Sequence, residues 1–206
     1  MLKLLLVRHG ETEWNREKRI QGAGSDIPLS DVGLRQAELV SQALRLESIT
    51  AVYASPLRRA RITAETIARP HGLTITEVPA FKEIDAGDLE GHKVSETPGM
   101  TLSSILVRDG NGAMPRLPGG ESLAELQARA WPPLQQIITS TPEGVVVVAS
   151  HYFTILTMVC SALGFPIDTV ARLTIGTGSI TTIRFTPGSA VLLSLGDTCH
   201  LERGTA

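Results

Sequence analysis

Three apolar, β-rich runs of the sequence each end in histidine or arginine side chains. The side chains that follow the runs at 2–7, 51–54 and 145–149 are Arg8 and His9, then Arg58-Arg59, then His151. If the runs are parallel strands, their carboxyl ends share one edge of a sheet and these side chains converge. Arginine forks match phosphate oxygens, and a neutral imidazole can attack phosphorus. The pattern therefore predicts an anion site with a histidine nucleophile.

Transfer of a phosphoryl group to histidine also requires a proton donor for the departing ester oxygen. Glu83 is the candidate, and Asp85 and Asp88 are the nearby alternatives. Taken alone, Glu83 would be interpreted as a solvated carboxylate after a strand. We assign Glu83 as the acid only because the predicted anion site beside it requires a proton donor.

Helical segments alternate with the apolar runs, which predicts an α/β fold in three layers: a mostly parallel central sheet with helices on both faces. Helices are expected from Ser30 to about 46, from Ser55-Pro56 to 69 by an N-cap and N1-proline pattern, between 121 and 139, and from 151 to 163. Pro132-Pro133 must start, bend or break the third of these. A hairpin is expected at 179–185 and 190–195, around Pro187-Gly188.

The 206 residues suit a single domain spanning 1–206. The segment 84–120 is rich in glycine, proline and polar residues, with one short helix expected near 102–108. It is too long for an ordinary connector, which predicts an active-site cover. We call residues 84–120 the cover segment.

Bulk composition excludes several classes of protein. A net charge of −2 and a pI near 6.2 give no basic footprint for nucleic acid. No apolar run approaches a membrane span, and the N-terminal run is too short for a signal-peptide core. Two cysteines cannot build a disulfide scaffold, and the five histidines show no metal-ligand spacing. We expect a cytoplasmic protein, monomeric or homodimeric, without metal or cofactor.

The stretch LLLVRHGETEWN, residues 4–15, resembles the signature of the histidine phosphatase superfamily, which includes the cofactor-dependent phosphoglycerate mutases. The resemblance continues in order through most of the chain. Its further blocks are Gln21-Gly22, residues 28–37, 55–60, 83–91, 118–122 and 148–151. It implies the phosphoglycerate mutase-like fold.

The resemblance also implies roles for matching residues. His9 would become phosphohistidine, and Glu83 would act first as acid and then as base. The phosphoryl oxygens would be held by Arg8, Arg59, His151 and Asn15; the family arginine precedes alanine, which selects Arg59 over Arg58. Fixed cationic donors can stabilise a metaphosphate-like transition state without a metal. His9 must then present a neutral nitrogen, with its other ring N–H held by a backbone carbonyl.

Two departures concern the substrate. Tyr152-Phe153 follow His151 where the family usually has a small residue, so either both aromatic side chains pack in the core beneath a helix start or Tyr152 narrows the pocket. The sequence Asp-Thr-Cys-His-Leu at 197–201 resembles the tail of metal-independent phosphoserine phosphatases, which makes His200 a candidate substrate contact; an ordinary surface tail is the alternative. Those enzymes tend to have histidine where Ala86 stands, which counts against phosphoserine.

The choice between phosphatase and mutase favours the phosphatase. The only arginines between Gly91 and Gly119 are Arg108 and Arg116, whereas the mutases carry a longer insertion with a basic pair. Gln21-Gly22, a candidate substrate contact, is similar to the phosphatase branch. We expect a phosphomonoesterase acting on a small phosphorylated metabolite such as phosphoserine or another small carboxylated phosphate. The alternatives are a phosphoglycerate mutase, a protein phosphatase and a catalytically silent phospho-ligand binder.

Overall fold

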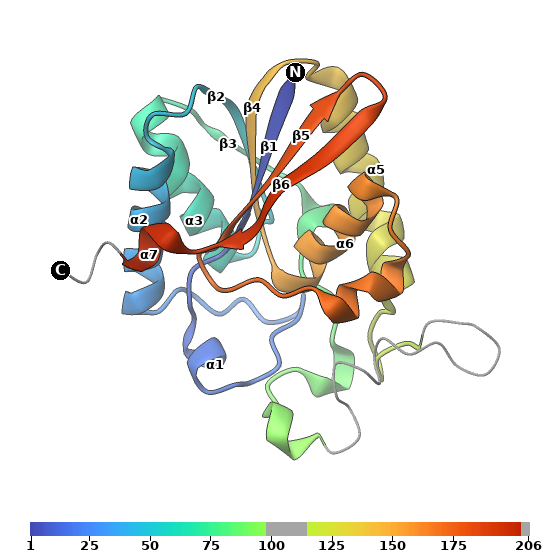
Figure 1. Ribbon diagram of the computed structural model, residues 1–206. Helices are drawn as coiled ribbons and strands as arrows, with labels where there is room; N and C mark the ends of the chain where they lie inside the picture. The colour runs from blue at the N-terminus through green and yellow to red at the C-terminus, as the bar shows by residue number, and fades with distance from the viewer. Residues whose placement is uncertain (98–114, 203–206) are drawn as a thin grey trace.

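The computed structural model describes residues 1–97 and 115–202, which form one six-stranded sheet flanked by helices (Figure 1). The strand order is β3-β2-β4-β1-β5-β6. The strands are β1 (Leu2–Arg8), β2 (Ile49–Ala54), β3 (Ile75–Glu77), β4 (Gly144–Ser150), β5 (Ile180–Thr186) and β6 (Ser189–Asp197). The first four are mutually parallel, and β5 and β6 form the expected antiparallel hairpin. The prediction of a mostly parallel sheet is confirmed.

Helices cover both faces of this sheet, as expected for three layers. Figure 1 shows α2 (Asp31–Leu44) and α3 (Arg58–Ala68) on one side, with α5 (Leu123–Ser140) and α6 (Tyr152–Leu163) on the other. Side chains of a strand alternate between faces, so the continuous apolar run of β1 serves both layers. Leu4 and Leu6 belong to the α5–α6 core, and Leu5 and Val7 belong to the α2–α3 core.

Short elements connect these layers. They are α1 (Glu13–Arg16), α7 (Cys199–Glu202) and the 3₁₀ turns η1 (Arg69–His71), η2 (Pro79–Phe81), η3 (Gly87–Leu89), η4 (Val94–Glu96) and η5 (Ile167–Arg172). The helix expected near 102–108 lies outside the described residues. Within the described part of the chain, no helix is both long and apolar enough to cross a membrane.

The predicted start of α3 is wrong. The helix begins at Arg58, and Leu57 occupies the N-cap position without a side-chain capping bond. The Ser55 hydroxyl instead lies 2.8 Å from Nε2 of His151. Ser55 therefore lies between the end of β2 and the start of α3, with its side chain directed toward His151. By contrast, Ser30 caps α2 as predicted, by accepting a hydrogen bond from the Gly33 amide.

Helix α5 continues through Pro132-Pro133 instead of breaking there. Each internal proline removes a helix hydrogen bond and costs about 3 kcal/mol or more. Buried side chains on both sides of the prolines offset this cost, because Leu126, Ala130 and Leu134 are all within 1 % of full burial. Ser122 and Glu125 close the N-terminus of α5 with a capping box.

Candidate active site

The carboxyl ends of β1, β2 and β4 bring the predicted side chains to one edge of the sheet. The His9 amide donates to the Ser150 carbonyl at 3.0 Å, which continues the β1–β4 pairing by one residue. The rings of His9 and His151 consequently lie 5.1 Å apart between centroids. The sequence-based expectation that both histidines meet at one edge is correct.

His9 is held as a neutral imidazole with one nitrogen free. Its Nδ1 lies 2.7 Å from the Gly10 carbonyl oxygen, so Nδ1 carries the proton and Nε2 keeps its lone pair. Burial lowers the pKa of His9 well below its usual range, and the charges of Arg59 and Arg8 lower it further. The predicted backbone-held tautomer is therefore the one that the structure contains.

Arg59 lies behind the two histidines and is fully buried. Its guanidinium donates to the carbonyls of Ser25 at 2.7 Å and Gly22 at 3.1 Å, and its Nε donates to Nδ1 of His151 at 3.3 Å. Burial lowers the pKa of Arg59 to about 10, which leaves it charged at neutral pH. The neighbouring Arg58 is exposed, so the geometry selects Arg59 at this edge.

Gly22 permits this close packing around Arg59. A Cβ atom there would lie 2.3 Å from Oε1 of Glu90 and 2.8 Å from the Ile84 carbonyl oxygen, so no side chain fits. The Gly22 carbonyl therefore binds Arg59, and Gly22 does not itself line the pocket that contains His9. His151, for its part, accepts from Arg59 through Nδ1 and directs its Nε2–H toward Ser55.

Arg8 approaches the same site from the end of β1. Its Nη1 donates to the Ile175 carbonyl at 2.8 Å, and its guanidinium carbon lies 5.1 Å from the centroid of the Tyr152 ring. Its Nε is buried and has no hydrogen-bond partner among the described residues. A buried guanidinium N–H without an acceptor is costly, so this atom is available to an anionic ligand.

The Glu83 carboxyl is buried, so its interpretation as a solvated carboxylate is wrong. Its Oε1 accepts from the amides of Ile84 and Thr154, and its Oε2 accepts from the Phe153 amide. Burial raises the pKa of Glu83, against the opposing effects of these backbone donors and of Arg59 and Arg8. A carboxyl in this state is suited to giving and taking a proton.

The two alternative acids lie elsewhere. The carboxylate of Asp85 accepts from the Gly87 amide at 2.9 Å, and that of Asp88 packs beside Gly119. Neither contributes to the pocket that contains His9 and Glu83. Among the three candidate carboxylates, Glu83 is the one that shares a cavity with His9.

A pocket of about 300 Å³ opens onto His9. Its polar lining residues are Arg8, His9, Asn15, Arg19, Gln21 and Glu83. Its apolar lining residues are Ile20, Ile84, Ala86, Leu89, Val94, Leu117, Tyr152 and Phe153. Tyr152 and Phe153 meet edge to face at 5.1 Å and also pack against the core, so both interpretations of this aromatic pair hold.

The remaining predicted contacts divide between this pocket and another surface. Asn15 and Gln21 are both tied to Thr12, whose amide donates to Asn15 and whose hydroxyl bonds to Gln21, each at 3.1 Å. His200 lies elsewhere: its Nε2 is 2.9 Å from the Gly178 carbonyl oxygen, and it lines a separate cavity beside α2. The structure does not bring His200 to the pocket.

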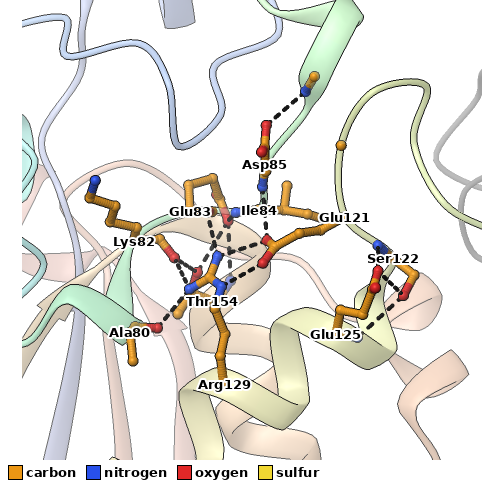
Figure 2. Close-up of polar contacts among 12 residues, drawn as sticks. Ala80, Lys82, Glu83, Ile84, Asp85, Glu121, Ser122, Glu125, Arg129 and Thr154 are labelled. Atoms are coloured by element: carbon orange, nitrogen blue, oxygen red, sulfur yellow. Dashed lines mark hydrogen bonds and ion pairs between the residues drawn. The ribbon is translucent and has the colours of Figure 1, made fainter.

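Sequence reasoning missed the residues that support these side chains. The Ser55 hydroxyl bonds to His151. The Thr154 amide, in the first turn of α6, bonds to Glu83, and both residues are labelled in Figure 2. Ser55 and Thr154 are ordinary hydroxyl residues; Ser55 directly follows the end of β2, which is a signal that could have singled it out, whereas Thr154 carries no such signal. Among the described residues, no group of three or more histidine, cysteine or acidic side chains is arranged to hold a metal ion.

The fold and the site are those of a known class of proteins, and sequence similarity identifies this class directly. The model of the histidine phosphatase superfamily (branch 1) matches residues 4–198, and the chain belongs to this superfamily. Among curated relatives, a probable phosphoglycerate mutase GpmB from Yersinia pestis (strain Pestoides F) is 36 % identical over 209 residues, covering 98 % of this chain and 96 % of the relative.

Solved structures of phosphatases are similar over nearly the whole chain. A phosphoserine phosphatase mutant from Entamoeba histolytica, in complex with phosphoserine, matches with 33 % identity and a TM-score of 0.86, covering 98 % of this chain and 100 % of that one. A mycobacterial glucosyl-3-phosphoglycerate phosphatase complexed with VO3 matches with 26 % identity and a TM-score of 0.86, covering 95 % and 99 %. The superfamily and these neighbours support a phosphatase.

Proposed function

We propose that this protein is a phosphomonoesterase that hydrolyses a small phosphorylated metabolite through a phosphohistidine intermediate on His9. The observation that carries the proposal is the neutral, tautomer-fixed His9 in one pocket with a buried carboxyl, Glu83, whose pKa is raised. These are the two states that a nucleophile and a general acid require.

In the first step, the lone pair of His9 Nε2 attacks phosphorus while the bond to the ester oxygen breaks. Protonated Glu83 gives its proton to that oxygen, and the alcohol leaves. In the second step, Glu83, now ionised, takes a proton from water as the water oxygen attacks the phosphorus. The P–N bond breaks, its electron pair returns to Nε2, and inorganic phosphate leaves.

Arg8 and Arg59 supply the positive charge for both steps. Arg8 has a buried Nε without an acceptor, and a phosphoryl oxygen would satisfy it. Arg59 and His151 form the fully buried layer behind His9, where a low dielectric strengthens their effect on developing charge. Two fixed guanidinium groups make the reaction independent of metal in this proposal.

Asn15, Gln21 and Tyr152 contact the substrate from the pocket wall. The wall beyond the phosphate is mainly apolar, and Ala86 stands within it. Arg19 is the further cation, but it is already committed to Glu17 and the Gly91 carbonyl. A carboxylated substrate would have to engage Arg19, whereas an ester with a more apolar carbon skeleton would pack directly on the wall. The substrate panel therefore includes both kinds.

The test is phosphate release from a panel of phosphomonoesters, combined with trapping of the intermediate. Wild-type enzyme quenched during turnover should carry an acid-labile, base-stable phosphate, and the His9→Ala variant should carry none and turn over less than a few per cent as fast. Near-normal turnover of a folded His9→Ala variant would overturn the proposal.

Phosphoglycerate mutase activity is the second candidate, favoured by the 36 % identical relative with that name. A mutase passes the phosphoryl group from phosphohistidine to a bound phosphoglycerate and takes the other phosphoryl group back from the bisphosphoglycerate so formed, whereas a phosphatase gives it to water. Incubation with 3-phosphoglycerate and a trace of 2,3-bisphosphoglycerate distinguishes them. Accumulation of 2-phosphoglycerate faster than inorganic phosphate would identify the mutase.

A further inference from the structure

Arg129 on α5 binds the backbone around Glu83. Its guanidinium donates to the carbonyls of Ala80 at 2.7 Å, Lys82 at 3.0 Å and Glu83 at 2.7 Å (Figure 2). Two further hydrogen bonds, at 2.7 and 2.9 Å, run from the same guanidinium to the carboxylate of Glu121. One side chain thus bonds three backbone carbonyls within residues 80–83 and one carboxylate.

Glu121 extends this contact to the other side of Glu83. Its Oε2 accepts from the Asp85 amide at 3.0 Å, and its own amide donates to the Asp85 carbonyl at 2.8 Å. Partial burial would raise the pKa of Glu121, but the hydrogen bonds from Arg129 and Asp85 hold it below its usual value. The ionised pair of Arg129 and Glu121 therefore hydrogen-bonds to the backbone on both sides of Glu83.

The local structure explains why the backbone at Glu83 needs hydrogen bonds from side chains. Glu83 belongs to no helix or strand, so no ladder of backbone hydrogen bonds fixes its position. The carbonyl of Lys82 is bonded by side chains instead, from Arg129 and from the hydroxyl of Thr154 at 2.8 Å. Arginine offers five N–H donors in a rigid fork, whereas lysine offers a single ammonium on a flexible stem.

The same contacts join the two ends of the cover segment. Asp85 stands at its beginning and Glu121 directly follows its end, and the two residues are bonded to each other through backbone and side chain. Arg129 therefore anchors the base of the cover segment and the Glu83 backbone with one group.

We propose that Arg129, locked by Glu121, is a positioning residue that keeps the Glu83 carboxyl in the catalytic geometry. The inference rests on the proposed function, since it assumes that Glu83 is the acid. Arg129 acts through the backbone of residues 82–85 and does not line the pocket. A misplacement of about 1 Å in a catalytic group can cost about 10²-fold in rate.

The first experiment compares Arg129→Gln with the matched control Arg61→Gln, which removes a helix arginine from a surface ion pair with Glu65. We expect Arg129→Gln to lower kcat for an alkyl phosphate by about 10- to 100-fold, with KM nearly unchanged. For p-nitrophenyl phosphate, whose leaving group needs little protonation, the burst of nitrophenolate that reports the first step should slow several-fold less than this. Arg61→Gln should leave both rates unchanged.

Arg129→Lys keeps the positive charge and loses the planar set of five N–H donors. It therefore separates the effect of the ion pair with Glu121 from the effect of the hydrogen bonds to the backbone carbonyls. It should remain close to Arg129→Gln in rate, because a point charge cannot bond three carbonyls and a carboxylate together. Recovery of wild-type kcat in Arg129→Lys would overturn the proposal. Thermal melting of each variant confirms that the compared proteins are folded at the assay temperature.

A double variant shows whether Arg129 acts through Glu83. If it does, Glu83→Gln with Arg129→Gln should be no slower on alkyl phosphate than Glu83→Gln alone. Fully multiplicative losses, or equal losses on both substrates, would assign Arg129 a purely structural role. This outcome is distinct from failure of the proposed function, which would appear as a wild-type enzyme that forms no phosphohistidine.

Discussion

Glutamine in place of Glu83 removes the proposed proton donor and keeps the shape of the side chain. The amide oxygen can occupy the place of Oε1, which accepts from two of the three backbone amides that donate to this carboxyl. The third donor, the Phe153 amide, then faces an NH2 group, at a cost of about 1–3 kcal/mol for a buried donor left unpaired. For a protein of this size that cost lowers Tm by about 2–12 °C, so the variant should stay folded at 25 °C.

Loss of a general acid lowers the rate by about 10²- to 10⁴-fold, which corresponds to about 2.7–5.4 kcal/mol of transition-state stabilisation. We expect this loss of kcat/KM in Glu83→Gln for an alkyl phosphate. For p-nitrophenyl phosphate the phenolate leaves without much help, so the first step should suffer much less. Hydrolysis of phosphohistidine then limits turnover, and nitrophenolate should appear in a burst equal to the enzyme concentration.

The assay is stopped-flow release of nitrophenolate beside steady-state release of phosphate from the alkyl ester. Asp85→Asn and Asp88→Asn are the matched controls, because each keeps an acceptor oxygen and neither carboxylate lines the pocket. Both should behave nearly as wild type. Equal damage to the two substrates in Glu83→Gln, without a burst, would refute the assignment of Glu83 as the acid.

The cation supply, the pH dependence and the core each give a further measurable outcome. Chelators such as EDTA should leave the rate unchanged, and loss of activity restored by magnesium or zinc would contradict the arginine-based site. Because burial raises the pKa of Glu83, kcat/KM for an alkyl phosphate should fall as pH rises through a value above the ordinary 4.5, and Glu83→Gln should lack this limb. Because the pKa of His9 lies well below 6.5, titration of His9 should not reduce activity until the pH is far below that value. Leu126→Ala, which empties a fully buried site on α5, should cost about 2–5 kcal/mol and lower Tm by about 4–20 °C in a thermal melt.

The strand ends were predictable because their signals are local. Apolar β-rich runs mark β1, β2 and β4, and the chemistry-bearing residues follow each run directly. Once the runs are parallel strands, geometry requires His9 and His151 to meet. By contrast, β3 spans only Ile75–Glu77, which is too short to show any periodicity. The predicted start of α3 is too early because the Ser55 hydroxyl bonds to His151 instead of capping the helix.

The placement of His200 shows a different limit. Its segment matched a tail that resembles those of phosphoserine phosphatases, but the match said nothing about the direction of the side chain. In the structure α7 packs beside α2, and the His200 ring bonds to the Gly178 carbonyl. The Gly178 amide in turn donates to the carbonyls of Arg8 and His9. The tail therefore supports the backbone at Arg8 and His9 through Gly178 and does not reach the pocket.

The state of Glu83 depends on contacts that no local pattern could reveal. Its carboxyl is buried because the first turn of α6 closes over it, and its backbone is held because Arg129 on α5 reaches back to it. In the sequence, Arg129 looks like an ordinary solvated charge on a helix, and nothing links it to Glu121, which lies eight positions earlier in the block at 118–122. In the structure they anchor Glu83, whose raised pKa suits the proposed chemistry. The proposed proton donor is thus positioned by the packing of α5 and α6 on the loop, and a mutation far from the pocket is expected to displace it.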